Sequence, residues 1–532
     1  MKPWCIKFGG GLFFALSLCL GAAVAHGQSL AEPFAAIDAE LESLQMAMAE
    51  QRLSALTAPA SETPTATYLR GKLAFFQGDY ATAYAHFLAA IGASKTELDW
   101  KNWRDRAQAT MAVLSARQAE QGRHGHFQIA YTDPRDALLA GRADDILNRQ
   151  LDALQAAFGD KPDMPVRVYI LASVSDFAAM SGLSIDRIET TATVAMSRYN
   201  RIMILSPRII SGGYPWLDTL AHELTHVFIT RLSRDRAPIW LQEGVAKYYE
   251  AAWRNLIPGE LSPEEAFLLE RAATERRLIP FRRFHPSVSF MPSQEDAVLA
   301  YAQALSFMQF VNTHATDENW MAALLREMAD GHSLESLLAK ATRADMRKLR
   351  MWWEKEVTAK HLAPRTIAPF LKKRFVAGAQ SRDIPDREFY DTEVRRQLRL
   401  GDLLRLRGHL REALEKYEAA AEENRVAAPD IAQRIAGCYI DLHQLDHAVD
   451  FLAPLIRLYP FQAVLHLQLA EARLRQDKAQ EAILSLLQTI AIDPFQSQVH
   501  CRLSEAYRRI GDVNNAATAE AHCQLLQRAP GQ

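Results

Sequence analysis

Two histidines and a glutamate that could do chemistry stand together in the sequence HELTH, as His222, Glu223 and His226. Imidazoles four residues apart lie on one face of a helix, one turn apart, so both can reach the same cation. Zinc accepts nitrogen ligands in tetrahedral geometry. The carboxylate of Glu223 lies beside the histidines, where it can take the proton of a metal-activated water that attacks a carbonyl. The spacing predicts a catalytic zinc site, and two solvated surface histidines are the alternative.

A zinc site of this kind needs a third ligand, and the sequence PIWLQEG at residues 238–244 offers Glu243. Two antiparallel helices joined by the short loop 231–237 would bring Glu243 back to the two histidines. A His₂Glu set with one open position is what a catalytic zinc requires. A carboxylate near a helix N-terminus is also favoured without any metal, so an exposed helical glutamate is the alternative.

Turn and periodicity signals indicate the elements that must position these residues. The turn SGGYP at residues 211–215 ends in a proline, which favours the start of a helix. An apolar stripe follows and should face a core, at Leu217, Leu220, Leu224, Val227 and Phe228. The apolar side of the second helix is Leu241, Val245, Tyr248 and Ala252. Upstream, the patterns predict strands at residues 127–131, 166–171 and 201–205 and a helix at residues 143–158.

Repeats organise the C-terminal part of the chain. Four alanines are spaced 35, 34 and 34 residues apart, at Ala413, Ala448, Ala482 and Ala516. Small residues recur where two helices cross closely, and the pattern resembles the tetratricopeptide repeat, a helix-turn-helix unit of about 34 residues. Stacked repeats form a concave groove that can bind proteins, so a protein partner is expected. Plain helical packing without a ligand is the alternative.

An isolated copy of the repeat stands near the N-terminus and includes Gly71, Tyr80 and Phe87. One repeat cannot bury its own apolar face. We therefore expect it to pack on its neighbours, among them helical stretches at about residues 31–56 and 97–120.

HELTH followed by PIWLQEG resembles the gluzincin-type metallopeptidases, and more closely the bacterial family often called peptidase MA-like, over roughly residues 125–355. The resemblance implies a zincin fold, in which a small mixed sheet precedes the active-site helix and a helical half follows. It also implies zinc held by His222, His226 and Glu243, with Glu223 as general base. Residues 201–205 would then be the sheet edge nearest the cleft, where an extended substrate could pair.

The same resemblance suggests a helix that returns past the metal site at AYAQA, residues 300–304. Amide hydrolysis needs a donor for the developing oxyanion. Tyr301 is the candidate, because similar enzymes use a tyrosine there, and a packed helical tyrosine is the alternative. His285 and Tyr248 are further candidates for this role.

Composition, charge and the N-terminus limit the class of protein. The chain has 532 residues and a formal net charge of −2, so the basic excess of a general nucleic-acid binder is missing. Lys2 and Lys7, an apolar run at residues 8–20 and the small-x-small site Ala23–Ala25 are typical of a secretory signal peptide. We expect cleavage after Ala25, with an uncleaved anchor as the alternative. No later stretch is apolar and long enough to span a bilayer.

Removal of residues 1–25 would leave three cysteines, Cys438, Cys501 and Cys523. An odd count leaves at least one thiol unpaired. We expect thiols buried in helix packing rather than a disulfide. Pairing of Cys501 with Cys523 stays open.

These patterns predict a predominantly α-helical protein. A zincin-like α+β metallopeptidase domain is followed by a tetratricopeptide solenoid and preceded by a short helical segment with one repeat. The expected parts are a signal peptide (1–25), a helical segment (26–122), a metallopeptidase domain (123–360), a linker (361–390) and the repeats (391–532). The expected function is that of a periplasmic or secreted zinc endopeptidase whose repeats recruit protein substrates or partners. The alternative is a repeat scaffold or chaperone-like adaptor in envelope protein quality control, with a structural or nearly idle metal domain.

Overall fold

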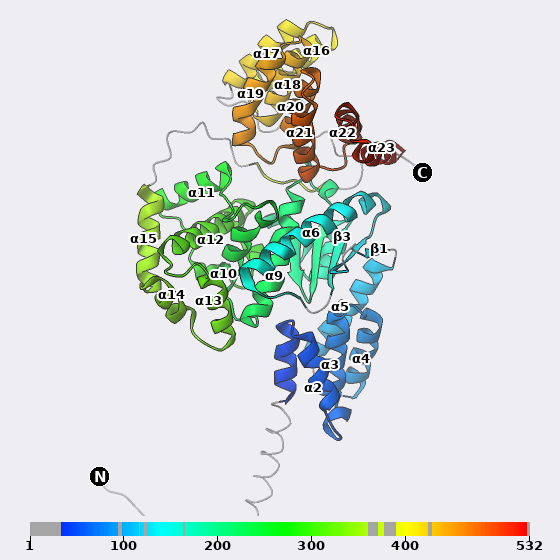
Figure 1. The fold of residues 1–532 in the computed structure, drawn as a ribbon, viewed down its shortest axis with the longest axis vertical. Coiled ribbons are helices and arrows are strands. Elements are labelled where there is room, and N and C mark those ends of the chain that lie inside the picture. Colours follow the sequence, from blue (N-terminus) through cyan, green and yellow to red (C-terminus); the bar gives the residue numbers. More distant parts are fainter. Residues whose placement is uncertain are drawn as a thin grey trace, which may run out of the picture. The chain divides into compact units, whose positions relative to one another are not determined.

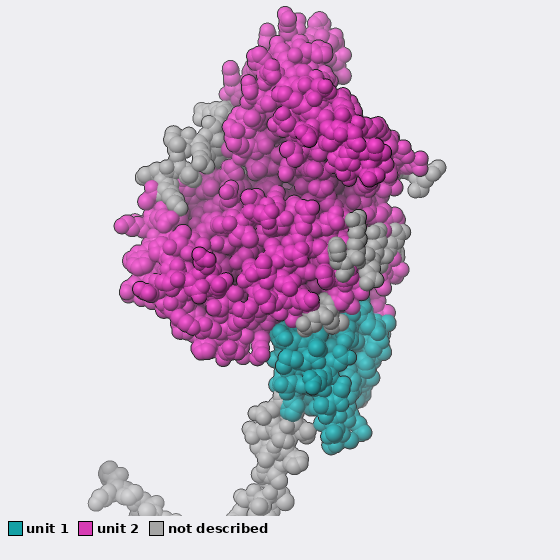
Figure 2. Space-filling view, in the orientation of Figure 1, with its two compact units in different colours: residues 1–108 teal, residues 109–532 magenta. Residues whose placement is uncertain are grey.

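The computed structural model describes residues 33–93, 98–115, 117–121, 125–162, 165–359, 371–376, 390–423 and 428–528. The expected signal peptide lies outside the described residues, as does most of the expected linker 361–390. Contacts divide the chain into two compact units, residues 1–108 and residues 109–532 (Figure 2). Helices dominate both units and one small sheet lies in the second (Figure 1), so the predominantly α fold class is confirmed.

The isolated repeat of the first unit is a helical hairpin. Helices α3 (Pro64–Phe76) and α4 (Tyr80–Ala93) are joined by a turn in which Gly78 has a φ of 80°, a conformation that favours glycine. The ring of Phe75 packs against Tyr80 and against Trp103 of α5 (Leu98–Leu114), and α2 (Met46–Ala55) contacts α3. The repeat therefore buries its apolar face against neighbouring helices, as a single repeat must.

The two helices of this hairpin approach closely at Gly71 of α3. A Cβ atom at Gly71 would lie 2.7 Å from the ring of Phe87, which is fully buried. We expect Gly71→Ala to lower the free energy of unfolding by about 1–3 kcal/mol through overpacking. In α4, a Cβ at Gly92 would meet no atom within 4 Å. Gly92→Ala should therefore raise the free energy of unfolding by up to about 1 kcal/mol, because alanine has the higher helix propensity. Denaturant unfolding of both variants tests this, and equal effects would contradict it.

The second unit contains a five-stranded sheet in the order β1-β2-β3-β5-β4 among its described residues. The three predicted strands are confirmed with their bounds, as β2 (Phe127–Tyr131), β3 (Val166–Leu171) and β5 (Arg201–Leu205). They are parallel, with Ile129 beside Val168 and Val168 beside Ile202. These central strands are almost wholly buried, which explains their continuous apolar character.

Two strands at the edges of the sheet were not predicted. The helical stretch expected to reach residue 120 ends at Leu114, and residues 118–121 form β1 (Gln118–Gln121), antiparallel to β2. The expectation that residues 201–205 are the sheet edge is also wrong, because β4 (Ala195–Arg198) pairs antiparallel with β5 and covers it. β4 and β5 are joined through Tyr199 and Asn200, both with left-handed φ, a hairpin without the usual glycine signal.

Helices pack around the sheet and form the rest of this part of the chain (Figure 1). The apolar stripe predicted from Leu217 to Phe228 is confirmed, since all five of its residues are buried in α9. The helix predicted at residues 143–158 begins earlier, at Ala137, and the second helix ends at Tyr249, before Ala252. The helices are α6 (Ala137–Phe158), α7 (Val174–Ser181), α8 (Ile185–Thr191), α9 (Trp216–Ser233), α10 (Ile239–Tyr249), α11 (Pro263–Thr274), α12 (Gln294–His314), α13 (Trp320–Ala329), α14 (Leu334–Thr342) and α15 (Met346–Ala359).

The C-terminal repeats form four consecutive helical hairpins. The recurring alanines, Ala413, Ala448, Ala482 and Ala516, are all buried. At Gly401 a Cβ would lie 2.5 Å from the ring of Tyr417, so small and large residues interlock as the repeat pattern predicts. The helices are α16 (Thr392–Leu406), α17 (Leu410–Glu423), α18 (Pro429–Asp441), α19 (Leu445–Leu458), α20 (Ala463–Arg475), α21 (Ala479–Ile492), α22 (Ser497–Arg509) and α23 (Val513–Arg528).

The expectation of unpaired thiols is wrong for two of the three cysteines. Cys501 in α22 and Cys523 in α23 form a disulfide, while Cys438 is free and buried. The two helices of the last hairpin run side by side and place the two Cα atoms 5.1 Å apart, within the range of a disulfide. This pairing depends on how two helices face each other, which the spacing of 22 residues does not reveal.

The repeat array packs directly on the start of α9. The buried indole of Trp216 donates a hydrogen bond to the carbonyl of Ile490 at 3.0 Å, and the amide of Tyr214 donates to the carbonyl of Ile492 at 3.0 Å. Gly213 has a φ of 75°, and an added Cβ would overlap the Ile492 carbonyl. The helix that carries HELTH is thus fixed at its first turn by the repeats.

Among the described residues, no helix has both the length and the apolar composition to cross a membrane.

Candidate metal centre

Three potential ligand atoms meet between α9 and α10. The Nε2 atoms of His222 and His226 are 3.2 Å apart. A carboxylate oxygen of Glu243 lies 3.2 Å from the first and 3.4 Å from the second. The loop between the two helices is short, and the structure brings together the three residues that the sequence proposes as ligands.

This spacing fits the corners of a tetrahedral metal site. Ligand atoms about 2.0–2.1 Å from a zinc ion at tetrahedral angles lie roughly 3.3–3.4 Å from one another. The three edges measured here are 3.2, 3.2 and 3.4 Å. Two imidazole nitrogens and one carboxylate oxygen are also a donor set that suits zinc. The residues therefore fit the ion that the sequence motif implies.

The three side chains stabilise one another's charged forms when no metal is bound. Burial raises the pKa of Glu243, but the charge of His226 and hydrogen bonds from both histidines outweigh burial and hold this pKa at about 2. Burial lowers the pKa of His222, whereas hydrogen bonds to Glu243 and Glu250 outweigh burial and raise it to about 10. Without a metal, His222 thus keeps a proton at neutral pH. A cation must displace that proton, because only the free imidazole nitrogen can be a ligand.

Glu250 supports the first histidine from the side opposite the ligand atoms. One of its oxygens lies 3.5 Å from Nδ1 of His222, and the other lies 2.5 Å from the ammonium of Lys247. Lys247 also contacts Glu265 at 3.0 Å. A carboxylate on the second ring nitrogen fixes the orientation of a metal-binding histidine. Glu250 is not among the residues predicted from the sequence, although it follows Glu243 by seven residues, two turns along the same face.

Glu223 faces the open edge of the sheet. Its carboxylate is buried and accepts a hydrogen bond from the backbone N–H of Ser197 in β4. Burial raises the pKa of Glu223, and the charges of His226 and His222 partly offset this rise. β4 is the edge strand, so the free backbone groups of this strand lie next to the candidate base.

Tyr301 lies beside the first candidate ligand and lines the same cavity. Its ring packs edge-on against His222, with ring centroids 5.9 Å apart. Burial raises the pKa of the phenol well above its usual range, and the charges of Glu243 and Glu223 add to this rise. The two other candidates for the oxyanion donor lie elsewhere: Tyr248 is buried beside Tyr249, and His285 is exposed. Neither is among the described residues that line the cavity next to His222 and Tyr301.

Close packing of α12 on α10 sets the position of Tyr301. A Cβ at Gly244 would lie 2.5 Å from the side chain of Met308 and 3.0 Å from the carbonyl of Ala304. Gly244 comes directly after Glu243, so the glycine lets α12 approach at the level of the ligand. The glycine of PIWLQEG is therefore a packing requirement of the site.

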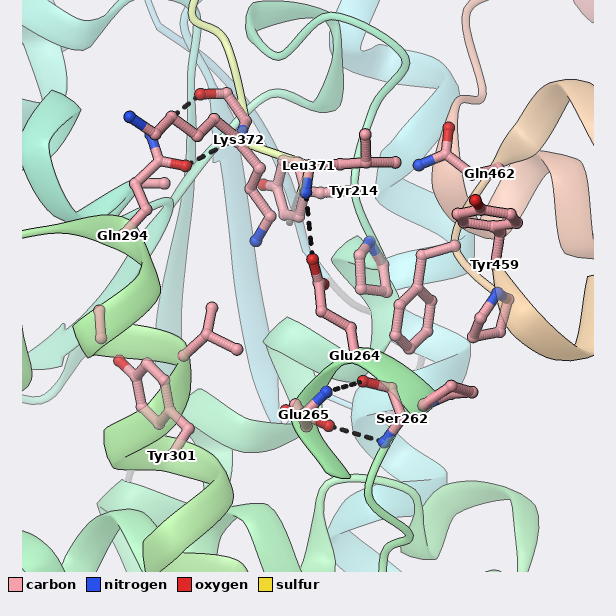
Figure 3. Close-up of a pocket in the computed structure, with 18 of the residues that line it drawn as sticks. Tyr214, Ser262, Glu264, Glu265, Gln294, Tyr301, Leu371, Lys372, Tyr459 and Gln462 are labelled. Carbon is pink, nitrogen blue, oxygen red and sulfur yellow. Dashed lines mark hydrogen bonds between the residues drawn. The ribbon is translucent and has the colours of Figure 1, made fainter. Parts of the chain in front are cut away.

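A cavity of about 1070 Å³ lies beside the candidate metal centre. His222, Glu223 and Tyr301 line it on one side, and Tyr459 and Phe461 of the repeat array line it as well. Figure 3 shows Tyr301 on one side of this cavity and Tyr459 and Gln462 on the other. The candidate catalytic residues and the repeats thus share one cavity.

Residues 147–359 match the sequence model of the Peptidase MA superfamily. This segment contains both HELTH and Glu243. A comparison with curated proteins finds no match. Solved structures similar to part of the chain include a crystal structure of MamA, 18% identical with a TM-score of 0.24 over 26% of this chain and 80% of that chain. Another is MamA 41-end from Desulfovibrio magneticus RS-1, 16% identical with a TM-score of 0.24 over 27% of this chain and 80% of that chain. Neither likeness bears on the activity of this chain.

Removal of one ligand should release the metal. We expect Glu243→Gln and His226→Ala to lower zinc affinity by more than the roughly 10–100-fold that loss of an outer-shell partner costs. Glu223→Gln should keep its zinc, because Glu223 is not one of the three converging ligands. The metal content of each purified variant, measured after equilibration with a zinc buffer, tests this. A Glu243→Gln chain that binds zinc like the unmodified chain would refute the ligand set.

Loss of the carboxylate behind His222 should have a smaller effect. We expect Glu250→Gln to weaken zinc binding roughly 10–100-fold, because the ring of His222 loses its charged partner. Glu415→Gln, an exposed position on α17, serves as the matched control and should bind zinc unchanged. Competition with a chromophoric chelator measures both affinities. Equal affinities would show that Glu250 does not orient the ligand.

Proposed function

We propose that this chain is an exported zinc-dependent endopeptidase. The observation that carries the proposal is the convergence of His222, His226 and Glu243 at tetrahedral spacing, with the carboxylate of Glu223 beside them. The match of residues 147–359 to the Peptidase MA superfamily supports a peptidase.

His222, His226 and Glu243 would hold the ion. When bound, zinc supplies a Lewis acid that makes water a stronger nucleophile at neutral pH and polarises a carbonyl. Glu223 is the general base, and its raised pKa suits a group that must first take up a proton and then pass it to the leaving amine. The hydrogen bond from Ser197 holds this carboxylate in place.

Tyr301 is the donor for the developing oxyanion. Its raised pKa keeps the phenol protonated at neutral pH, so the O–H is available to donate. The packing of its ring on His222 places this donor next to the metal ligands. The substrate backbone is expected to pair with the free edge of β4, which takes the place that the sequence assigned to residues 201–205.

The size of the cavity favours an extended segment of polypeptide as substrate. A volume of about 1070 Å³ is at the upper end of ligand cavities and is far too small for a folded domain. The repeat array would recruit protein substrates or partners, as stacked repeats do. Since the sequence contains no separate motif for a free N-terminus, we favour cleavage within a chain.

Export to the periplasm or to the outside of the cell is part of the proposal. The N-terminal pattern ending at Ala25 is that of a signal peptide. The disulfide between Cys501 and Cys523 is consistent with an oxidising compartment, where such bonds persist.

Replacement of the general base tests the enzymatic proposal. We expect Glu223→Gln to lower kcat for peptide hydrolysis by roughly 10²–10⁴-fold while zinc stays bound, because only proton transfer is lost. Hydrolysis of casein or a quenched fluorescent peptide measures the rate, with Glu415→Gln as control. An unchanged rate would refute the endopeptidase. Rescue of a deletion phenotype by Glu223→Gln would favour the scaffold or adaptor alternative.

A second variant tests the oxyanion donor. We expect Tyr301→Phe to lower kcat roughly 10²–10³-fold with little change in KM, because the hydroxyl acts on charge that develops in the transition state. The phenylalanine keeps the ring that packs on His222. A loss of bound zinc, or a change in KM alone, would contradict this role for Tyr301.

A further inference from the structure

The repeat array presents one aromatic turn to the cavity of the metal centre. Residues 459–462, with the sequence YPFQ, connect α19 to α20, and all four line the cavity. A ring nitrogen of His466 lies 2.9 Å from the carbonyl oxygen of Pro460 and holds the turn. Phe461 is 42% exposed, so much of its ring is open to the cavity that it lines.

The same turn recurs 34 residues later and serves as an internal comparison. Pro494, Phe495 and Gln496 repeat the sequence, and His500 contacts the Pro494 carbonyl at 2.7 Å. Here the phenylalanine is 3% exposed and is not among the described residues that line the cavity. The turn itself therefore does not require an exposed ring, and of the two rings only that of Phe461 is open to the cavity.

The first residue of the two turns also differs. Asp493 caps its own turn, since its carboxylate accepts hydrogen bonds from the amide of Phe495 and the side chain of Gln496. Tyr459 stands at the equivalent position and packs in an apolar cluster with Leu452 and Leu465. It is 6% exposed, and its buried hydroxyl has no hydrogen-bond partner among the described residues.

The walls of this cavity already hold an extended backbone. In the segment 371–376, the amide of Leu371 donates to Glu264 at 3.2 Å. The side-chain amide of Gln294 both accepts from the N–H and donates to the carbonyl of Lys373, at 2.9 and 3.0 Å (Figure 3). The side chain of Leu371 packs on the cluster that contains Tyr459. The structure thus already contains one extended segment, residues 371–376, that packs an apolar side chain against this cluster.

We propose that Phe461 forms a substrate subsite on the repeat array. It takes a bulky apolar side chain of an extended polypeptide against the ring of Phe461. The subsite lies in the same cavity as His222, Glu223 and Tyr301, so it selects segments that reach the metal centre. The inference rests on the proposed endopeptidase for its substrate, but binding at the subsite does not require hydrolysis.

The test measures binding without cleavage, in the full-length, zinc-loaded Glu223→Gln chain. The probes are labelled peptides with one phenylalanine at successive positions in a polar background, and the same peptides with serine in its place. Fluorescence anisotropy should show tighter binding of the phenylalanine peptides. Phe461→Ala should weaken that binding about tenfold and leave the serine peptides unchanged, as expected for the loss of one well-packed aromatic contact.

Leu484→Ala is the matched control, because Leu484 is an exposed apolar residue of α21 and is not among the described residues that line the cavity. It should bind both kinds of peptide unchanged. Equal binding of phenylalanine and serine peptides, no binding of either, or an unchanged affinity in Phe461→Ala would overturn the subsite.

Hydrolysis of the same peptides by the wild-type chain separates the two proposals. Cleavage that does not depend on Phe461 would refute the subsite and leave the endopeptidase intact. Phe461-dependent binding without any cleavage by the wild type would refute the endopeptidase and leave the subsite intact.

Discussion

The meeting of two imidazole nitrogens and one carboxylate oxygen within 3.4 Å of one another is the constraint on which the rest of the second unit depends. The three atoms come from two helices, so the crossing of α9 and α10 must be fixed to a fraction of an ångström. The buried apolar stripe of α9 holds one helix, and the close approach of α12 at Gly244 holds the other. Neither helix can shift without opening the ligand set.

The charged side chains around His222 are a second constraint on this site. Glu223 and Glu243 are buried close to His222, and Glu250 is partly buried there. The partly buried Lys247 pairs with Glu250 and Glu265. Carboxylates of like charge repel each other strongly where water is excluded. The proton on His222 compensates for part of this charge, and a divalent cation would compensate for more. The local excess of acidic groups is thus a physical reason for a cation site that is independent of the sequence motif.

The parts of the site that the sequence could predict are those fixed by short-range spacing. His222, Glu223 and His226 follow from one helical turn, and the strands β2, β3 and β5 follow from continuous apolar runs. The parts that could not be predicted depend on contacts between distant elements or on weak local signals. β4 is a short strand behind a Tyr199–Asn200 turn without glycine, and β1 is a polar strand that exists because β2 offers it a partner. The role of Glu250 and the disulfide of Cys501 likewise depend on which side chains face each other across helices.

The contact between the repeats and the first turn of α9 has a consequence for how such a chain could arise and change. Repeat arrays are often gained, lost or exchanged as modules. Here the loss of α21 would leave the indole N–H of Trp216 without its acceptor and uncover a large aromatic surface next to Tyr214. An exchanged array would need a carbonyl at the position of Ile492 and space for the turn at Gly213. The two parts are therefore expected to be inherited together, with substitutions on one side of this contact compensated on the other.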